Sequence, residues 1–150
     1  MKKWKTYAAY IIVTLLGGIL VALFTMDGMQ VYSALEKPML TPPAWLFPIA
    51  WTILYILMAI GASRYALKSK MISGVYFLQL IVNYLWSVIF FGFNAYLFAF
   101  FWLLLLLVLV IVMTVQFYKV DKLAGLLQIP YILWLVFAGY LNIMVYLLNK

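Results

Sequence analysis

Charged residues divide the chain into long uncharged stretches. These cover residues 6–26, 38–63, 71–118 and 123–149, with lengths of 21, 26, 48 and 27 residues. An α-helix needs about 20 apolar residues to cross about 30 Å of hydrocarbon. The first, second and fourth stretches therefore each hold one membrane crossing, and the third is long enough for two.

The third stretch has a natural break at Gly92-Phe93-Asn94, since glycine and asparagine favour turns. The stretches are continuously apolar and do not alternate with a period of two, which favours helices over a β-barrel. We predict an all-α integral membrane protein with one domain over residues 1–150. Its five transmembrane helices cover about 6–26, 44–67, 71–92, 95–118 and 123–148.

Composition supports this class and excludes several others. Apolar residues make up 70% of the chain and charged residues 9%, whereas soluble domains carry about 25% charged residues. Disorder is excluded because it requires low hydrophobicity and high charge. The chain has no Cys and no His, which excludes disulfides, metal sites built on these ligands, and catalytic triads that use His.

The basic residues predict the orientation of the bundle in the membrane. Two of them, Lys37 and Lys150, fall on one side, and eight fall on the other: Lys2, Lys3, Lys5, Arg64, Lys68, Lys70, Lys119 and Lys122. Basic residues collect in cytoplasmic loops. We therefore expect a plasma-membrane protein with a cytoplasmic N-terminus, an outside C-terminus and an outward-facing loop 27–43. The net charge of +7 follows from this arrangement and does not indicate nucleic-acid binding.

Three predicted helices carry a narrow face of aromatic and amide side chains at helical spacing. The faces consist of Phe47, Trp51, Tyr55 and Met58; of Gln79, Asn83, Trp86 and Phe90; and of Tyr131, Trp134, Ala138 and Asn142. One interpretation is that the amides bond across the bundle and the rings fill its interior. The other is that the faces line a cavity for a large, flat, apolar ligand. The residue pattern leaves both open.

The remaining features limit the possible chemistry. The fourth predicted helix has an unbroken leucine run at 103–107, followed mostly by Val and Ile, and its only polar residues are Thr114 and Gln116 near its end. This is typical of a helix that faces lipid or another subunit. The acidic residues Asp27, Glu36 and Asp121 all fall in loops. Ion-coupled transport and acid–base hydrolysis are therefore poorly supported, because both usually need ionisable groups within the site.

Four blocks in order along the chain carry a more specific pattern. They are Lys37-Pro38-x-x-x-Pro42-Pro43-x-Trp45, Phe47-Pro48-x-x-Trp51-Thr52-x-Leu54-Tyr55, Asn83-x-x-Trp86-Ser87-x-x-Phe90-Phe91-Gly92, and Pro130-Tyr131-x-x-Trp134-x-x-Phe137-Ala138-x-x-Leu141-Asn142. Together they resemble the TspO/MBR family of tryptophan-rich sensory proteins and translocator proteins, formerly peripheral benzodiazepine receptors. The resemblance covers nearly the whole chain.

The resemblance implies a five-helix bundle, usually a homodimer, with one pocket capped by loop 27–43. It implies binding of porphyrins such as protoporphyrin IX and, in several bacterial members, their oxidative breakdown by light and oxygen. No covalent cofactor or metal is expected. Trp51 and Trp134 would carry the photochemistry. The ligand-binding positions would be Ala22, Tyr32, Trp51, Asn83, Trp86, Phe90, Trp134, Ala138 and Asn142.

One position departs from the animal members, whose sterol motif has a Tyr where this chain has Ile143. A sterol is therefore not expected as the ligand.

Three functional hypotheses follow from the residue pattern and the resemblance. The protein binds tetrapyrroles and degrades them in light, or it binds, senses or transports an apolar small molecule without turnover. Alternatively, it is a membrane subunit whose fourth helix docks another protein.

The charge bias generates a test of orientation. A cysteine added after Lys150 should react with an impermeant thiol reagent in intact cells, because the protein has no other thiol and the C-terminus is expected outside. Labelling only after lysis would reverse the orientation.

Overall fold

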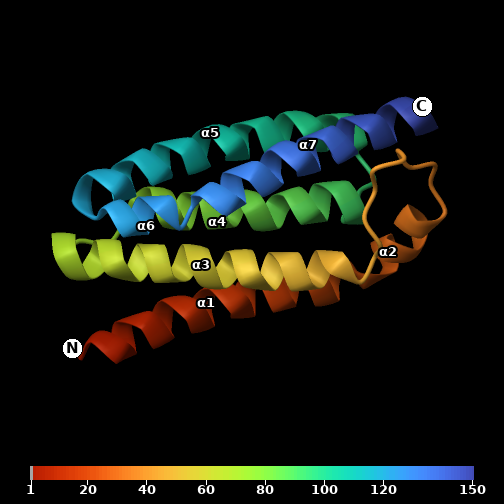
Figure 1. The fold of residues 1–150 in the computed structure, drawn as a ribbon. Helices are drawn as coiled ribbons and strands as arrows, with labels where there is room; N and C mark the ends of the chain where they lie inside the picture. The colour runs from red at the N-terminus through yellow and green to blue at the C-terminus, as the bar shows by residue number, and fades with distance from the viewer. Residues whose placement is uncertain (1) are drawn as a thin grey trace.

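The computed structural model describes residues 2–150 and contains five long helical spans (Figure 1). Each is long and apolar enough to cross a membrane, which confirms the predicted fold class. Orientation in the membrane stays a prediction. The spans are α1 (Lys3–Phe24), α3 (Leu46–Ser69), α4 with the π-helical turn η1 (Gly74–Ser87 and Val88–Gly92), α5 (Tyr96–Val120), and α6 with α7 (Lys122–Leu126 and Ile129–Asn149).

The helices pack side by side, with the chain termini at opposite ends of the bundle (Figure 1). Helix α1 packs mainly on α3, while α5 packs between α4 and α7. Helix α3 contacts α6 more than α7.

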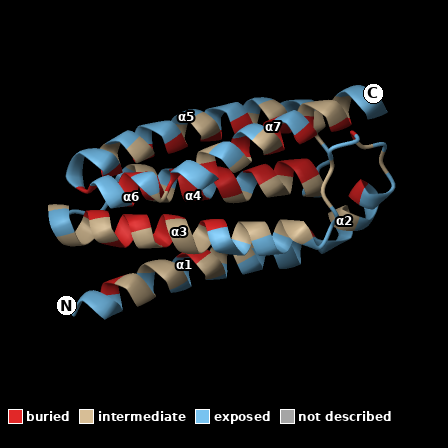
Figure 2. Cartoon of the chain, in the orientation of Figure 1, coloured by how far each residue is buried: buried red, intermediate tan, exposed pale blue. Residues whose placement is uncertain are grey.

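The core runs along the centre of the bundle, and the outer faces are apolar and exposed (Figure 2). Helix α5 shows the division. It buries Ala99, Leu103 and Leu106 at helical spacing and exposes Phe98 and Phe101. Contiguous apolar surface of this kind is unfavourable in water and suits contact with lipid.

Local signals explain where the spans begin and end. Ser73 caps α4, because its Oγ accepts a hydrogen bond from the Tyr76 N–H at 3.2 Å. Asn94 has a φ of 53°, a left-handed conformation that asparagine tolerates better than most residues. The predicted break at 92–94 is therefore present.

The fifth span differs from the single helix predicted over 123–148. It consists of the five-residue α6 and the longer α7, separated at Leu127–Gln128. Pro130 explains the break, because proline lacks an N–H and its ring clashes with the carbonyl four residues earlier. It sits in the first turn of α7, where the missing donor costs least.

The loop predicted over 27–43 contains a short helix in its first part. Residues Met26–Ser33 form α2, directly after α1. Thr25 separates the two helices, and its hydroxyl donates to the Val21 carbonyl at 2.9 Å. Such side-chain bonds compete with the helical ladder and bend it, so the chain turns here and continues helically.

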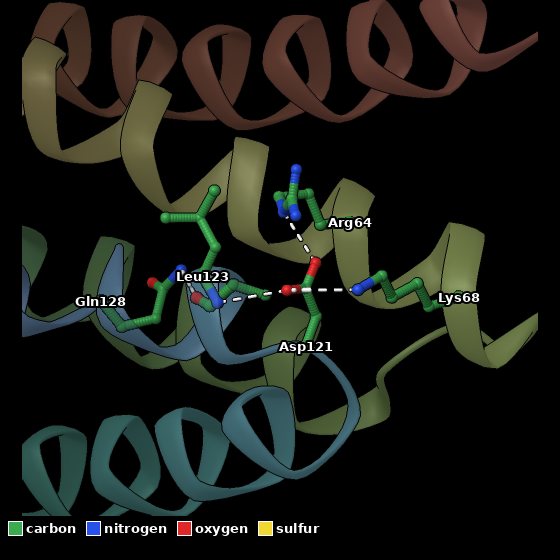
Figure 3. Close-up of polar contacts among 6 residues, drawn as sticks. Arg64, Lys68, Asp121, Leu123 and Gln128 are labelled. Atoms are coloured by element: carbon green, nitrogen blue, oxygen red, sulfur yellow. Dashed lines mark hydrogen bonds and ion pairs between the residues drawn. The ribbon is translucent and has the colours of Figure 1, made fainter.

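The end of the bundle away from α2 is held by one buried carboxylate (Figure 3). An oxygen of Asp121 lies 2.7 Å from Arg64 Nε, and the other lies 3.5 Å from Lys68 Nζ. The Leu123 N–H also donates to Asp121 at 3.1 Å, which caps α6. Asp121 therefore ties the α5–α6 turn to α3.

The same contacts set the ionisation of Asp121. Burial alone would raise the pKa of its carboxyl, but the hydrogen bonds from Arg64 and Leu123 and the charges of Arg64 and Lys68 hold the pKa below its ordinary value of 3.8. The carboxylate is therefore charged at neutral pH.

Replacing Asp121 should show how much its contacts with Arg64 and Lys68 contribute to the stability of the fold. Asp121→Asn keeps the size and a helix cap but removes the charge, so we expect a loss of about 1–3 kcal/mol in stability at pH 7. Because the folded pKa is lowered, the charge contributes fully above pH 3.8 and is lost as pH falls below it. Thermal unfolding in detergent should therefore separate wild type from variant at pH 7 and bring them together in strong acid. The exposed Asp27→Asn serves as control, and a variant as stable as wild type at pH 7 would contradict the assignment.

Candidate functional site

A cavity of about 340 Å³ lies at the end of the bundle that carries α2. This volume falls within the range of small-molecule pockets. Its walls come from the second half of α1, from α2, from the start of α3, from the end of α4 with η1, and from α7. Ala22 and Met26 line it and are also exposed, so the cavity reaches the surface of the bundle.

Aromatic rings form most of the wall between α3 and α7. The ring centroids of Trp51 and Trp134 are 6.3 Å apart, with an interplanar angle of 85°. Phe47 lies edge-on to Trp134 at 6.0 Å, and Tyr55 lies 5.5 Å from Trp51. The two tryptophans thus come from different helices and share one wall of one cavity.

A second aromatic group comes from the end of α4. Trp86 stacks on Phe90 at 5.3 Å and 29°. Phe90 belongs to η1, a π-helical turn, and such turns are frequent at functional sites because they redirect side chains.

The structure brings eight of the nine predicted ligand-binding positions to this cavity. They are Ala22, Tyr32, Trp51, Trp86, Phe90, Trp134, Ala138 and Asn142. Their binding of a ligand stays a prediction. The sequence pattern did not single out other lining residues such as Thr25, Met26 and Met29, although the spacing of Thr25, Met29 and Tyr32 matches one helical face.

Asn83 is the exception, since it does not line the cavity. Tyr55 OH donates to its Oδ1 at 2.9 Å, and its Nδ2 donates to Tyr131 OH at 2.7 Å. Tyr131 OH in turn donates to Gln79 Oε1 at 2.8 Å. A buried amide without partners is costly. The requirement for partners therefore places Asn83 in a cross-helix network.

Asn142 lines the cavity and bonds across the bundle as well. Trp86 Nε1 donates to its Oδ1 at 3.0 Å, and its Nδ2 donates to the Tyr96 carbonyl at 2.8 Å. The amides on these faces therefore bond across the bundle, as the first interpretation predicts, and several residues of the same faces line the cavity. That the cavity holds a flat apolar ligand stays a prediction. Because these amides bond within the protein, the cavity offers a ligand mainly apolar and aromatic surface.

Helix α2 covers the cavity in direct contact with η1. A side chain at Gly28 would overlap the Phe91 carbonyl, so glycine permits this close approach. Tyr32 packs against Phe90 at 5.8 Å and Phe91 at 5.6 Å. Burial raises the pKa of the Tyr32 phenol above its ordinary value of 10, which keeps its hydroxyl protonated at neutral pH.

The segment 34–45 that follows α2 is anchored at two points. The Glu36 N–H donates to Asn149 Oδ1 at 3.0 Å, and Asn149 Nδ2 donates back to the Glu36 carbonyl at 2.8 Å. Lys37 Nζ donates to the carbonyls of Tyr32, Ser33 and Leu35 at 2.9–3.2 Å. The amide pair, called here the Asn149 clasp, thus joins this segment to the end of α7.

A sequence model of the TspO/MBR family matches residues 10–147. The chain belongs to the TspO/MBR family. The match reaches from α1 to the last turns of α7 and so includes every helix that lines the cavity.

Individual TspO/MBR relatives align over nearly their full length. Protein CrtK of Rhodobacter capsulatus is 39% identical over 149 residues, which cover 95% of this chain and 92% of that protein. Tryptophan-rich protein TspO of Archaeoglobus fulgidus is 38% identical over 94% and 95% of the two chains. The translocator protein of Bos taurus is 30% identical over 93% and 87%. The chain is thus a multi-pass membrane protein of this family.

The Asn149 clasp should control the mobility of segment 34–45. Asn149→Ala removes both hydrogen bonds, each worth about 0.5–1.5 kcal/mol. The Glu36 amide should then exchange with deuterium about tenfold faster, as measured by mass spectrometry of the detergent-solubilised protein. Lys150→Ala is the matched control, and unchanged exchange in Asn149→Ala would show that the clasp does not hold the segment.

Proposed function

We propose that this TspO/MBR protein binds a tetrapyrrole of the protoporphyrin IX type in the cavity and promotes its oxidative breakdown in light. The observation that carries the proposal is the pair of tryptophans from α3 and α7, 6.3 Å apart in the wall of one aromatic cavity. Aromatic walls favour a flat conjugated ligand through stacking.

The surroundings of the pair fit such a ligand. The lining includes no Asp, Glu, Lys or Arg, so ionised groups of a ligand would be unfavourable inside. Because the cavity reaches the surface beside Ala22 and Met26, the conjugated ring can lie inside while carboxylates remain at the opening. Recognition then rests on shape and stacking.

The chemistry would come from the ligand and the indoles. Residues 2–150 contain no group of three His, Cys, Asp or Glu side chains that could hold a metal ion. Indole is the most easily oxidised side chain in the lining. An indole of Trp51 or Trp134 can give one electron to the light-excited porphyrin, which passes that electron to molecular oxygen and forms superoxide. The oxidised indole then takes an electron back from the porphyrin, and the porphyrin radical cation combines with superoxide. The indole is restored, and molecular oxygen is the oxidant of the porphyrin.

The second candidate is binding, sensing or transport without turnover. The names of the relatives, tryptophan-rich TspO and translocator protein, are compatible with it, and the same cavity would serve. The homodimer expected from the family resemblance stays a proposal, as does a partner protein on the exposed face of α5.

One experiment separates the hypotheses. Protoporphyrin IX is titrated into the protein in detergent, and the complex is then illuminated while its visible absorption is followed. Saturable binding with bleaching beyond a protein-free control supports the proposed function. Binding without extra bleaching supports a binding or transport protein, and no binding leaves a structural or partner-binding subunit.

The tryptophan pair generates the sharpest prediction. Trp51→Phe and Trp134→Phe keep much of the ring area but remove the easily oxidised indole. Because the ring area is largely kept, each variant should bind protoporphyrin IX within about threefold of wild type, a difference of about 0.7 kcal/mol. Each should lose at least about 90% of the bleaching rate, because the indole is gone. The double variant should add little, because groups that act as a unit are not additive.

Trp45→Phe is the matched control, because Trp45 is 66% exposed and lies outside the cavity lining. It should bleach the porphyrin at the wild-type rate. If both cavity variants bleach the porphyrin at the wild-type rate, Trp51 and Trp134 only line a binding site and take no part in the photochemistry.

A further inference from the structure

A second hollow lies at the opposite end of the bundle from the cavity. It is a groove of about 280 Å³ between the last turns of α5, the short α6 and the start of α7. Its exposed walls are apolar, with one lysine among the lining residues, which are Thr114, Val115, Tyr118, Lys119, Gly125, Leu126 and Ile129. The aromatic cavity shares no residue with it.

The groove exists because the fifth span is broken. Gly125 of α6 lies so close to α5 that a side chain there would come within 2.6–2.9 Å of Tyr118. Leu126 and Ile129, on either side of the break, stay 54% and 41% exposed. Helix α6 therefore forms a floor against α5, and two aliphatic side chains border the open side.

The charged residues around the groove are mostly positive. Asp121 is the acid at this end, and it is already paired with Arg64 and Lys68 (Figure 3). Lys119 and Lys122 flank the α5–α6 turn and are exposed, and neither forms an ion pair within residues 2–150. Lys119 thus brings a free ammonium group to the lining of the apolar groove, and Lys122 is the first residue of the helix that forms its floor.

We propose that this groove binds one anionic phospholipid. An acyl chain lies along the apolar walls beside Val115, Leu126 and Ile129, and the phosphate lies near the ammonium groups of Lys119 and Lys122. The apolar walls favour a lipid over a soluble anion. The unpaired lysines favour an anionic headgroup over a zwitterionic one, because basic residues at the membrane surface attract anionic lipid.

Tyr118 at the edge of the groove suits this level of the membrane. Aromatic side chains with a polar tip are enriched where hydrocarbon meets headgroups, and Tyr118 is exposed in the last turn of α5. The ring and the lysines therefore place the headgroup at the end of α5 and the acyl chain below it.

The test compares two lipids with the same acyl chains. Delipidated protein in neutral detergent is titrated with dioleoyl-phosphatidylglycerol or dioleoyl-phosphatidylcholine, and bound lipid is counted by native mass spectrometry. Wild type should prefer the anionic lipid, and K119Q/K122Q should lower this preference at least fivefold. K2Q/K3Q removes the same charge from the same end and should lower it less than twofold.

Two further arms identify what the groove recognises. Val115→Trp fills the groove from the lipid-exposed face and should weaken the binding of both lipids, with the helical content measured by circular dichroism unchanged. Glycerol phosphate at the same concentration should not displace phosphatidylglycerol, since it lacks the acyl chain.

Several results would overturn the proposal. They are equal affinity of wild type for the two lipids, an equal loss in both lysine pairs, unchanged binding in Val115→Trp, or full displacement by glycerol phosphate. The last result would indicate a site for soluble anions. Porphyrin binding is not involved in any of these measurements.

Discussion

A membrane-spanning bundle must find partners for its buried polar groups mostly within itself, because hydrocarbon offers no hydrogen-bond partners. Here the amides and phenols of α3, α4 and α7 meet in one network, in which Asn83 bonds both Tyr55 and Tyr131. A second junction joins Trp86 of α4, Asn142 of α7 and the Tyr96 carbonyl at the start of α5. These contacts fix how the helices that line the cavity stand relative to one another.

The same constraint gives the cavity its chemical character. Since Asn142 uses both its oxygen and its nitrogen within the protein, little polar capacity remains for a ligand. What remains exposed to the cavity is mainly aliphatic and ring surface, including Trp51 and Trp134. One polar atom is left over, Trp134 Nε1, which is buried without a hydrogen-bond partner. A site of this kind selects by shape and stacking, and any chemistry in it depends on how easily its rings and its ligand are oxidised.

The sequence predicted the spans well because charges mark their ends and apolar length marks their number. It also predicted that the faces carrying Trp51, Trp86 and Trp134 turn inward, since amides on the same faces cannot face lipid. It could not predict that Asn83 leaves the cavity wall, because that depends on which phenol hydroxyl lies within reach in three dimensions. Helix α2 was not predicted, because the charges at Asp27 and Lys37 mark only a segment between two membrane spans. The packing of Gly28 against η1 appears only in three dimensions.

The two ends of the bundle are stabilised by different interactions, neutral hydrogen bonds at the α2 end and ion pairs at the α6 end. At the α2 end, close backbone packing and neutral hydrogen bonds, such as those between Glu36 and Asn149, cover an apolar cavity without placing a charge in its lining. At the other end, the pairing of Asp121 with Arg64 fastens the α5–α6 turn and leaves its neighbouring lysines unpaired. Surplus positive charge at that end costs little, because it is exposed to solvent and headgroups, whereas the same charge in the cavity lining would be desolvated. Segregating charge in this way lets a chain with few charged residues both fix its position in a bilayer and keep its interior cavity neutral.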